Sequence, residues 1–205
     1  MGKKLAKRED EEKRKREKEE EIKRRKALLK SIDKEVAEKL GNDAPHVNVK
    51  LSKGRVEILK PLMFHKSKST LHDYSRRTVL DQVAKTLRVL QEVAHRRGLP
   101  LARFHIEGHT NCADPKKRDN KYHMKLSTDR ANVVHKHLLK HHSIHEDMLT
   151  PKGFGGVRRI HEEDHEDPTM RDVKMNQRVE FNLCNADELT EGVHRSANGQ
   201  LEMDV

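Results

Sequence analysis

The sequence predicts an α/β fold, an α+β sandwich in which helices cover one face of a mixed β-sheet and a long charged helix precedes the sheet. Three observations favour it. Two segments beyond Pro45 repeat apolar residues at helical spacing, short strand-like segments stand before and between them, and charge dominates the first 40 residues. The order strand, helix, strand, helix, turn or short strand, then strand requires a helix layer packed on a mixed sheet.

The composition limits the chain to one small domain with appendages. Its 205 residues are 33% apolar and 38% charged and include no Trp, so the core must be small. We expect a charged helical extension over 1–40, a linker over 41–46, an α/β domain over 47–184 and a polar tail over 185–205.

The N-terminal extension is predicted to be helical by its charge pattern. Residues 1–40 hold 16 Lys/Arg and 11 Asp/Glu. From Glu9 to Arg25, acids repeatedly precede bases by four residues, and each such pair stabilises a helix by roughly 0.2–0.5 kcal/mol. An apolar stripe at helical spacing then predicts that the end of this helix docks on another surface. The stripe consists of Leu29, Ile32, Val36 and Leu40. A solvated or disordered tail is the alternative interpretation.

The first half of the domain contains a hairpin and a helix. Residues 47–51 and 56–59 are strand-like and can pair across 52–54. Apolar residues at helical spacing from Val79 to Ala94 predict an amphipathic helix that ends before Gly98.

The second half contains another strand and another helix before a last strand. Residues 103–107 alternate apolar and polar side chains, as a half-buried strand does. Ser127 is the predicted N-cap of the second helix. Residues 150–156 are turn-rich, residues 157–175 form an acidic loop containing His, and alternation over 179–183 predicts the last strand.

Four short motifs follow one another along this domain. They are Gly108-His109-Thr110-Asn111 after a strand, Leu126-Ser127-Thr128-Asp129-Arg130-Ala131 in a helix, Gly153-Phe154-Gly155-Gly156 in a turn, and Asn176-Gln177-Arg178-Val179 before the last strand. Together they resemble the OmpA-like (OmpA/MotB C-terminal) family, whose signature is G-H-T-D, L-S-x-x-R-A, G-x-G-E and N-R-R-V in this order. The resemblance covers residues 47–183.

The resemblance implies a ligand cleft as well as a fold. In bacterial members, an Asp and an Arg hold the two charges of a diaminopimelate side chain of peptidoglycan through charge-assisted hydrogen bonds. Here the family's arginines correspond to Arg130 and Arg178, and Asn111 replaces the Asp. The usual acid after the first-strand Phe is His65, and the Asn before L-S is His123. The expected ligand-binding residues are Arg130, Arg178, Asn111, Thr110, His65 and His123.

The altered cleft favours a different ligand from peptidoglycan. An amide at position 111 forgoes the charge that attracts an ammonium group, and the chain begins without an export signal. We therefore expect a cytoplasmic scaffold protein whose arginines hold a carboxylate of a partner, with peptidoglycan anchoring as the alternative. Structural roles for Arg130 and Arg178 remain open.

The partner is expected to be an acidic protein surface within a larger assembly. Tubulin in a ciliary microtubule is one candidate, which would place the protein at the cytoskeleton. The positive net charge of +10 favours such a surface. The predicted contact residues are Arg24 and Arg25 of the helix and Lys116, Lys117 and Arg118 of a longer loop.

Other classes of function receive less support from the sequence. RNA within a ribonucleoprotein is a second alternative, but binding would be unspecific because no aromatic-basic motif is present. No apolar stretch is long enough to span a membrane. No phosphate loop or nucleophile elbow occurs, so we expect no enzyme, no catalytic residue and no cofactor.

Histidines and cysteines give no strong signal for a metal site or a disulfide framework. His137 and His141 could share one helix face, but no third ligand is evident, so no metal is expected. Two cysteines, Cys112 and Cys184, fit free thiols in a reducing cytosol.

Overall fold

The computed structural model describes residues 2–112, 114–160 and 176–190. The elements are α1 (Gly2–Leu40), β1 (Val47–Lys50), β2 (Arg55–Ile58), α2 (Leu80–Arg96), β3 (Phe104–Gly108), α3 (Lys121–His142), β4 (Leu149–Gly153) and β5 (Val179–Leu183). Single turns of 3-10 or π helix lie at Leu51–Lys53, Ser75–Val79, Pro115–Lys117 and Glu146–Met148.

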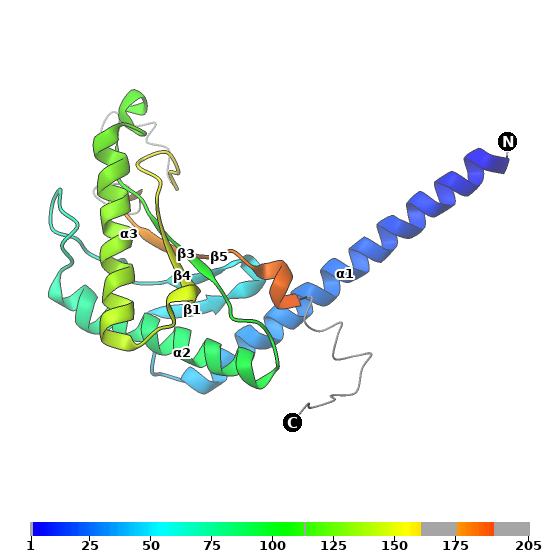
Figure 1. The fold of residues 1–205 in the computed structure, drawn as a ribbon, viewed down its shortest axis with the longest axis horizontal. Helices are drawn as coiled ribbons and strands as arrows, with labels where there is room; N and C mark the ends of the chain where they lie inside the picture. Colours follow the sequence, from blue (N-terminus) through cyan, green and yellow to red (C-terminus); the bar gives the residue numbers. More distant parts are fainter. Residues whose placement is uncertain (1, 113, 161–175, 191–205) are drawn as a thin grey trace.

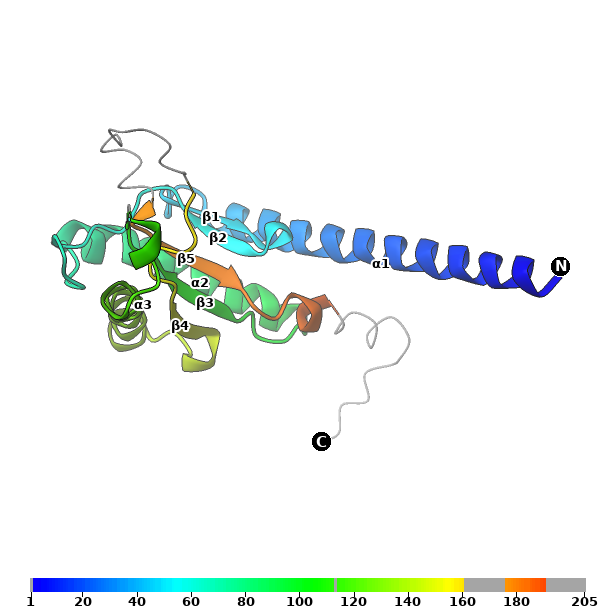
Figure 2. The same ribbon diagram turned by 90° about the horizontal axis from the view of Figure 1, so that it is seen from above.

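The strands form one mixed sheet in the order β1-β2-β5-β3-β4. Strands β3 and β4 are parallel, since α3 connects them, and the other neighbours are antiparallel. Helices α2 and α3 lie against the sheet, and α1 packs beside α2 (Figure 1; Figure 2). The predicted α/β class with a mixed sheet is confirmed.

The core lies between the sheet and the helices. Phe104 and Ile106 of β3 and Phe181 of β5 are fully buried, as strand alternation requires for residues on one face. The α2 stripe covers them with four buried side chains at helical spacing, Leu80, Val83, Leu87 and Leu90. The predicted hairpin is also present, with Val47 opposite Ile58 and Lys50 opposite Arg55.

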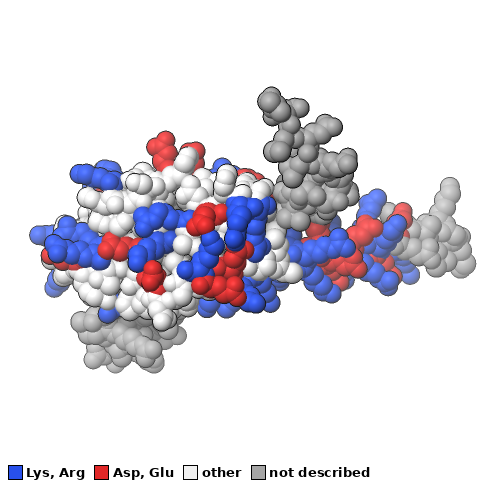
Figure 3. All heavy atoms as spheres, turned by 90° about the horizontal axis from the view of Figure 1, so that it is seen from below, with Lys and Arg blue, Asp and Glu red and all other residues white. Residues whose placement is uncertain are grey.

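Helix α1 is docked at one end and exposed at the other. Its apolar stripe packs against α2 and β1, and Ile32 and Val36 are 1% and 0% exposed. The described side chains from Asp10 to Glu20 are all exposed. We call residues 2–26 the arm: it projects from the domain (Figure 1), and basic and acidic side chains are intermixed along the part of it whose side chains are described (Figure 3).

The predicted N-cap of the second helix is wrong. Helix α3 begins at Lys121, because the side-chain oxygen of Asn120 accepts the N–H of His123 at 2.9 Å and caps the helix earlier. Ser127 lies inside the helix, where its hydroxyl donates to the carbonyl of Met124 at 2.9 Å. The same hydroxyl accepts the N–H of Gly155 at 2.8 Å and so ties the helix to the turn after β4.

The two segments expected to connect or follow the domain are packed where the structure describes them. Residues 41–46 form a tight turn in which Ala44 is buried and the N–H of His46 donates to Gln82 at 2.8 Å. Residues 186–190 form a helical turn, and Leu189 is 1% exposed because it packs on the core. The rest of the predicted tail, and residues 161–175 of the predicted acidic loop, lie outside the described residues.

None of the described helices combines the length and the apolar character that a membrane span needs. Cys112 is buried and Cys184 is exposed, and both are free thiols.

Candidate functional site

The motif residues are brought together by a close contact between α3 and two strands. Gly108 and Gly153 are register partners in β3 and β4. A Cβ on Gly108 would lie 2.1 Å from the carbonyl oxygen of Ser127, and one on Gly153 would lie 2.2 Å from Oγ1 of Thr128. Only glycine lets the helix approach this closely, so this seam of two glycines places the loop after β3 beside the start of α3.

Arg130 extends from α3 into a buried pocket that the chain itself fills. The residue is 1% exposed, and its Nε donates to the carbonyl of Lys68 at 3.1 Å. The guanidinium carbon lies 4.9 Å from the ring centroid of Phe64. With its amide oxygen turned toward Arg130, Gln177 accepts from Nη1 at 2.8 Å and from Nη2 at 2.5 Å. Burial lowers the pKa of Arg130 to about 10, so the group is still charged at neutral pH.

Polar residues of the loop after β3 lie beside this pocket. Thr110 is buried, and its Oγ1 is 3.1 Å from Nδ1 of His123. Burial, with the positive charge of Arg130, lowers the pKa of His123 and keeps the imidazole neutral at pH 7. The side-chain oxygen of Asn111 is buried and has no hydrogen-bond partner among the described residues. The structure thus brings Thr110 and His123 into contact, with Arg130 close enough to act on the imidazole.

Arg178 is not part of this group. It lies on the opposite face of the sheet, since Val179 and Phe181 point into the core and alternate with Arg178 and Glu180. Its Nε donates to Glu180 at 2.6 Å, and it lines a groove between β2 and β5 together with Leu59. The expected pair of arginines in one cleft is therefore wrong, because the alternation turns Gln177 instead of Arg178 toward Arg130.

The remaining predicted residues are spread over other surfaces. His65 is exposed, and its ring stacks on His72 with 4.0 Å between the centroids. Lys116 and Lys117 are exposed, whereas Arg118 is half-buried and its carbonyl accepts the N–H of Gly156 at 2.8 Å. Arg24 of the arm is exposed. Arg25 is engaged within the chain, with Glu21 and with Asp187, each at 2.7 Å.

A buried charged network around His109 was missed by the sequence reasoning. His109 is 1% exposed, and its Nε2 lies 3.7 Å from Glu180 and 3.9 Å from Glu107. Each carboxylate already has an arginine: Arg158 pairs with Glu107 at 2.7 Å and Arg178 with Glu180 at 2.6 Å. Burial and these two arginines lower the pKa of His109 to about 4, although Glu180 opposes the shift. The sequence did contain a signal for this network. Glu107 and His109 are two residues apart, as are Arg178 and Glu180, so each pair is expected on one face of the sheet.

We expect this network to make stability depend on pH. From pH 7 to pH 5, the wild type should lose about 2 kcal/mol more of its unfolding free energy than the variant His109→Gln. In the unfolded chain the imidazole binds a proton near its ordinary pKa of 6.5, but in the folded chain only near 4. The unfolded state therefore binds more protons in this window and is favoured as the pH falls. Urea unfolding at several pH values measures the difference. Parallel curves for the two proteins would contradict the burial of a neutral His109.

A comparison of the sequence with known protein families finds a match. The OmpA family matches residues 63–171, more than half of the 205-residue chain. No curated protein matches the sequence.

Three solved structures of similar fold illustrate the likeness. The periplasmic domain of Helicobacter pylori MotB is 19% identical with a TM-score of 0.46, over 65% of this chain and 76% of that one. The OmpA-like domain of Francisella tularensis FopA1 is 19% identical with a TM-score of 0.42, over 60% and 71%. The peptidoglycan-associated lipoprotein of Burkholderia pseudomallei is 16% identical with a TM-score of 0.45, over 61% and 91%. The match to the OmpA family spans more than half of the length of this chain, and the chain therefore belongs to the OmpA family.

Proposed function

We propose that this protein is a non-catalytic docking module of a larger assembly. Its OmpA-family domain binds a carboxylate of a partner protein beside Arg130, and its arm lies along an acidic surface of the same partner. The folded unit of this module begins within α1, at the apolar stripe, because that stripe is part of the core.

The observation that carries the proposal is a buried cation, Arg130, that has no counter-ion among the described residues. No carboxylate of the described residues pairs with Arg130, whereas Arg158 and Arg178 each have one. A buried charge is costly unless it is paired, and a carbonyl and an amide compensate it only in part. A carboxylate that takes the place of the Lys68 carbonyl or the Gln177 amide would make the stronger, charge-assisted hydrogen bond. The loop of residues 65–70 must yield for this exchange.

The arm supports binding to an extended acidic surface. Residues 1–40 carry a net charge of +5, and Lys23, Arg24 and Lys26 form an exposed basic cluster next to the domain. Because the stripe anchors the helix, the arm is held in a fixed direction and gives up little conformational entropy on binding. A microtubule, whose tubulin tails are acidic, is one such surface.

Peptidoglycan is the second candidate, and family membership favours it. A site for a zwitterionic side chain needs an anion for the ammonium group and a cation for the carboxylate. Arg130 supplies the cation, but Asn111 supplies only an amide oxygen, which has no hydrogen-bond partner in the part of the chain that the structure describes. The substitution Asn111→Asp therefore has opposite expected effects on the two ligands.

The test compares binding of a Glu-rich peptide and of purified peptidoglycan. Asn111→Asp should weaken binding of the peptide about tenfold, which corresponds to about 1.4 kcal/mol, because the added negative charge next to Thr110 repels the peptide carboxylate. The same variant should bind more peptidoglycan than the wild type. The control is Asn48→Asp, an equal charge change at an exposed position of β1. A chain without residues 2–26 should bind the peptide less tightly at low salt, with little difference at high salt.

Three outcomes would contradict the proposal. Equal peptide affinity of Asn111→Asp and Asn48→Asp would exclude the Arg130 pocket as the site. Tight peptidoglycan binding by the wild type would favour the anchor. Preference for RNA over the peptide at equal salt would favour a ribonucleoprotein.

A further inference from the structure

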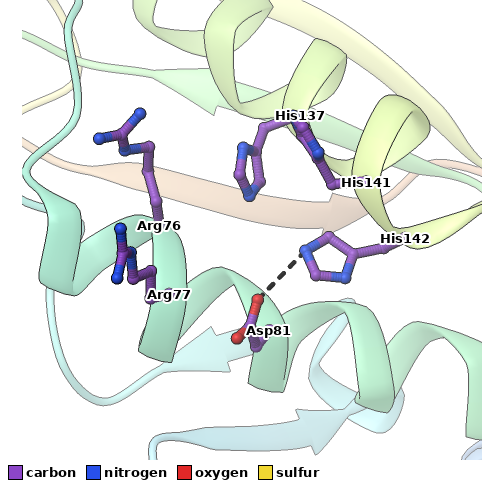
Figure 4. Close-up of a pocket in the computed structure, with 6 residues that line it drawn as sticks. All are labelled: Arg76, Arg77, Asp81, His137, His141 and His142. Atoms are coloured by element: carbon purple, nitrogen blue, oxygen red, sulfur yellow. Dashed lines mark ion pairs between the residues drawn. The ribbon is translucent and has the colours of Figure 1, made fainter.

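A small pocket lies where the beginning of α2 meets the end of α3, away from the Arg130 pocket. Its volume is about 320 Å³. It is lined by Arg76, Arg77, Asp81, His137, His141 and His142 (Figure 4). In Figure 4, Asp81 and His142 point toward each other across the two helices, and His137 points into the space beside them.

We propose that Asp81, His137 and His142 form a binding site for a divalent transition metal ion of the zinc type. One ligand atom from each residue lies within 4.8 Å of the other two. In a tetrahedral zinc site with bonds near 2.0–2.1 Å, neighbouring ligand atoms are about 3.3 Å apart. Asp81 Oδ1 and His142 Nε2 are already separated by 3.3 Å. Only His137 must therefore adjust its side chain to complete three ligands, and a fourth position stays open to the pocket.

The chemistry of the three groups fits a metal better than an anion. His137 and His142 are half-buried, and an imidazole in its neutral form offers a lone pair to a metal. A neutral imidazole adds no positive charge for an anion. Asp81 contributes the negative charge that a dication requires, and Arg76 is paired with Asp73 outside the cluster.

The other group of potential ligands among the described residues is less suitable. It consists of Glu107, His109 and Glu180. Arg158 and Arg178 already neutralise its two carboxylates, so a metal ion would have to displace both arginines. The cluster at Asp81 contains no such competitor on its carboxylate, which pairs only with a histidine among the described residues.

A bound metal would join two helices that are distant in sequence. His137 and His142 both lie in α3, whereas Asp81 lies in α2. Spacing along the sequence therefore does not reveal Asp81 as a ligand. The metal would bind the folded chain in preference to the unfolded one and would hold the end of α3 on α2.

The test is titration of the full chain with Zn²⁺ in a buffer that does not coordinate metals. Calorimetry should show one site, and Zn²⁺ at about 100 times Kd should raise Tm by roughly 5–10 °C. Asp81→Asn and His142→Gln should each weaken binding tenfold or more, since loss of even an outer-shell partner costs about 10–100-fold. His95→Gln, an exposed histidine on α2, should leave the affinity unchanged. Co²⁺ should give a visible spectrum without a thiolate band.

Several results would overturn the proposal. A wild type that binds no Zn²⁺, or one whose affinity survives both Asp81→Asn and His142→Gln, excludes the site. Loss of binding in His141→Gln together with full binding in Asp81→Asn would assign the metal to the His137/His141 pair on one helix face. A thiolate band with Co²⁺ would assign it to a cysteine. Circular dichroism of each variant excludes unfolding as the cause.

Discussion

Replacing Gly108 by Ala is expected to destabilise the protein by about 3 kcal/mol or more. The new Cβ would lie 2.1 Å from the carbonyl oxygen of Ser127 and 3.4 Å from the backbone nitrogen of Ala131. Both atoms belong to the backbone of α3, so no side-chain rotation relieves the clash. The helix must move away from β3, and the buried contacts of Ala131 and Val134 with the sheet are weakened. Urea unfolding monitored by circular dichroism measures the loss.

Gly98→Ala is the matched control for this prediction. Gly98 has a φ of +63°, and nothing lies within 4 Å of an added Cβ. Only backbone strain of about 1–2 kcal/mol is expected there. Equal losses for the two variants would show that the helix does not depend on the glycine seam. Because the seam also positions the loop that carries Thr110 and Asn111, ligand binding should fall in Gly108→Ala before the fold is lost.

Replacing Arg130 by Ala is expected to cost about 4 kcal/mol of stability. The substitution leaves a cavity beside Phe64 and removes the donors for the Lys68 carbonyl and the Gln177 amide. The loop of residues 65–70 should then detach from α3. Thermal or urea unfolding measures the stability, and faster hydrogen exchange in this loop locates the change.

Arg130→Met separates packing from charge. Methionine keeps most of the apolar stem against Phe64 and removes a buried charge that pairs with no carboxylate of the described residues. Replacement of a buried charge by an apolar side chain of similar volume is often tolerated, so the loss should be about half of that in Arg130→Ala. Arg14→Ala, on the exposed arm, should change stability by less than about 0.5 kcal/mol. If Arg130→Met also keeps full affinity for the Glu-rich peptide, Arg130 is structural only.

We propose that Arg130 and Asn111 account for how this member of the family differs from a peptidoglycan anchor. Arg130 supplies a buried cation, whereas Asn111 supplies no negative charge. A partner with an isolated carboxylate would match this arrangement.

Much of the fold follows from local sequence patterns. The α2 helix, the β1–β2 hairpin and the strands β3 and β5 were predicted because apolar periodicity reflects which face is buried. The apolar stripe of α1 also predicted a docked end, and Ile32 and Val36 are indeed buried. Four motifs in order were enough to predict the family.

The sequence by itself thus determined the elements, their order and the family, since these depend on local periodicity and on short motifs. Only the tertiary structure decided which side chains meet. It turned Gln177 instead of Arg178 toward Arg130, because neighbouring residues of a strand point to opposite faces. It also brought Asp81 to His142, 61 positions apart, because α2 and α3 pack on the same sheet. Spacing along the chain gives the face on which a side chain lies, but which side chains of different elements meet depends on how the layers pack in space.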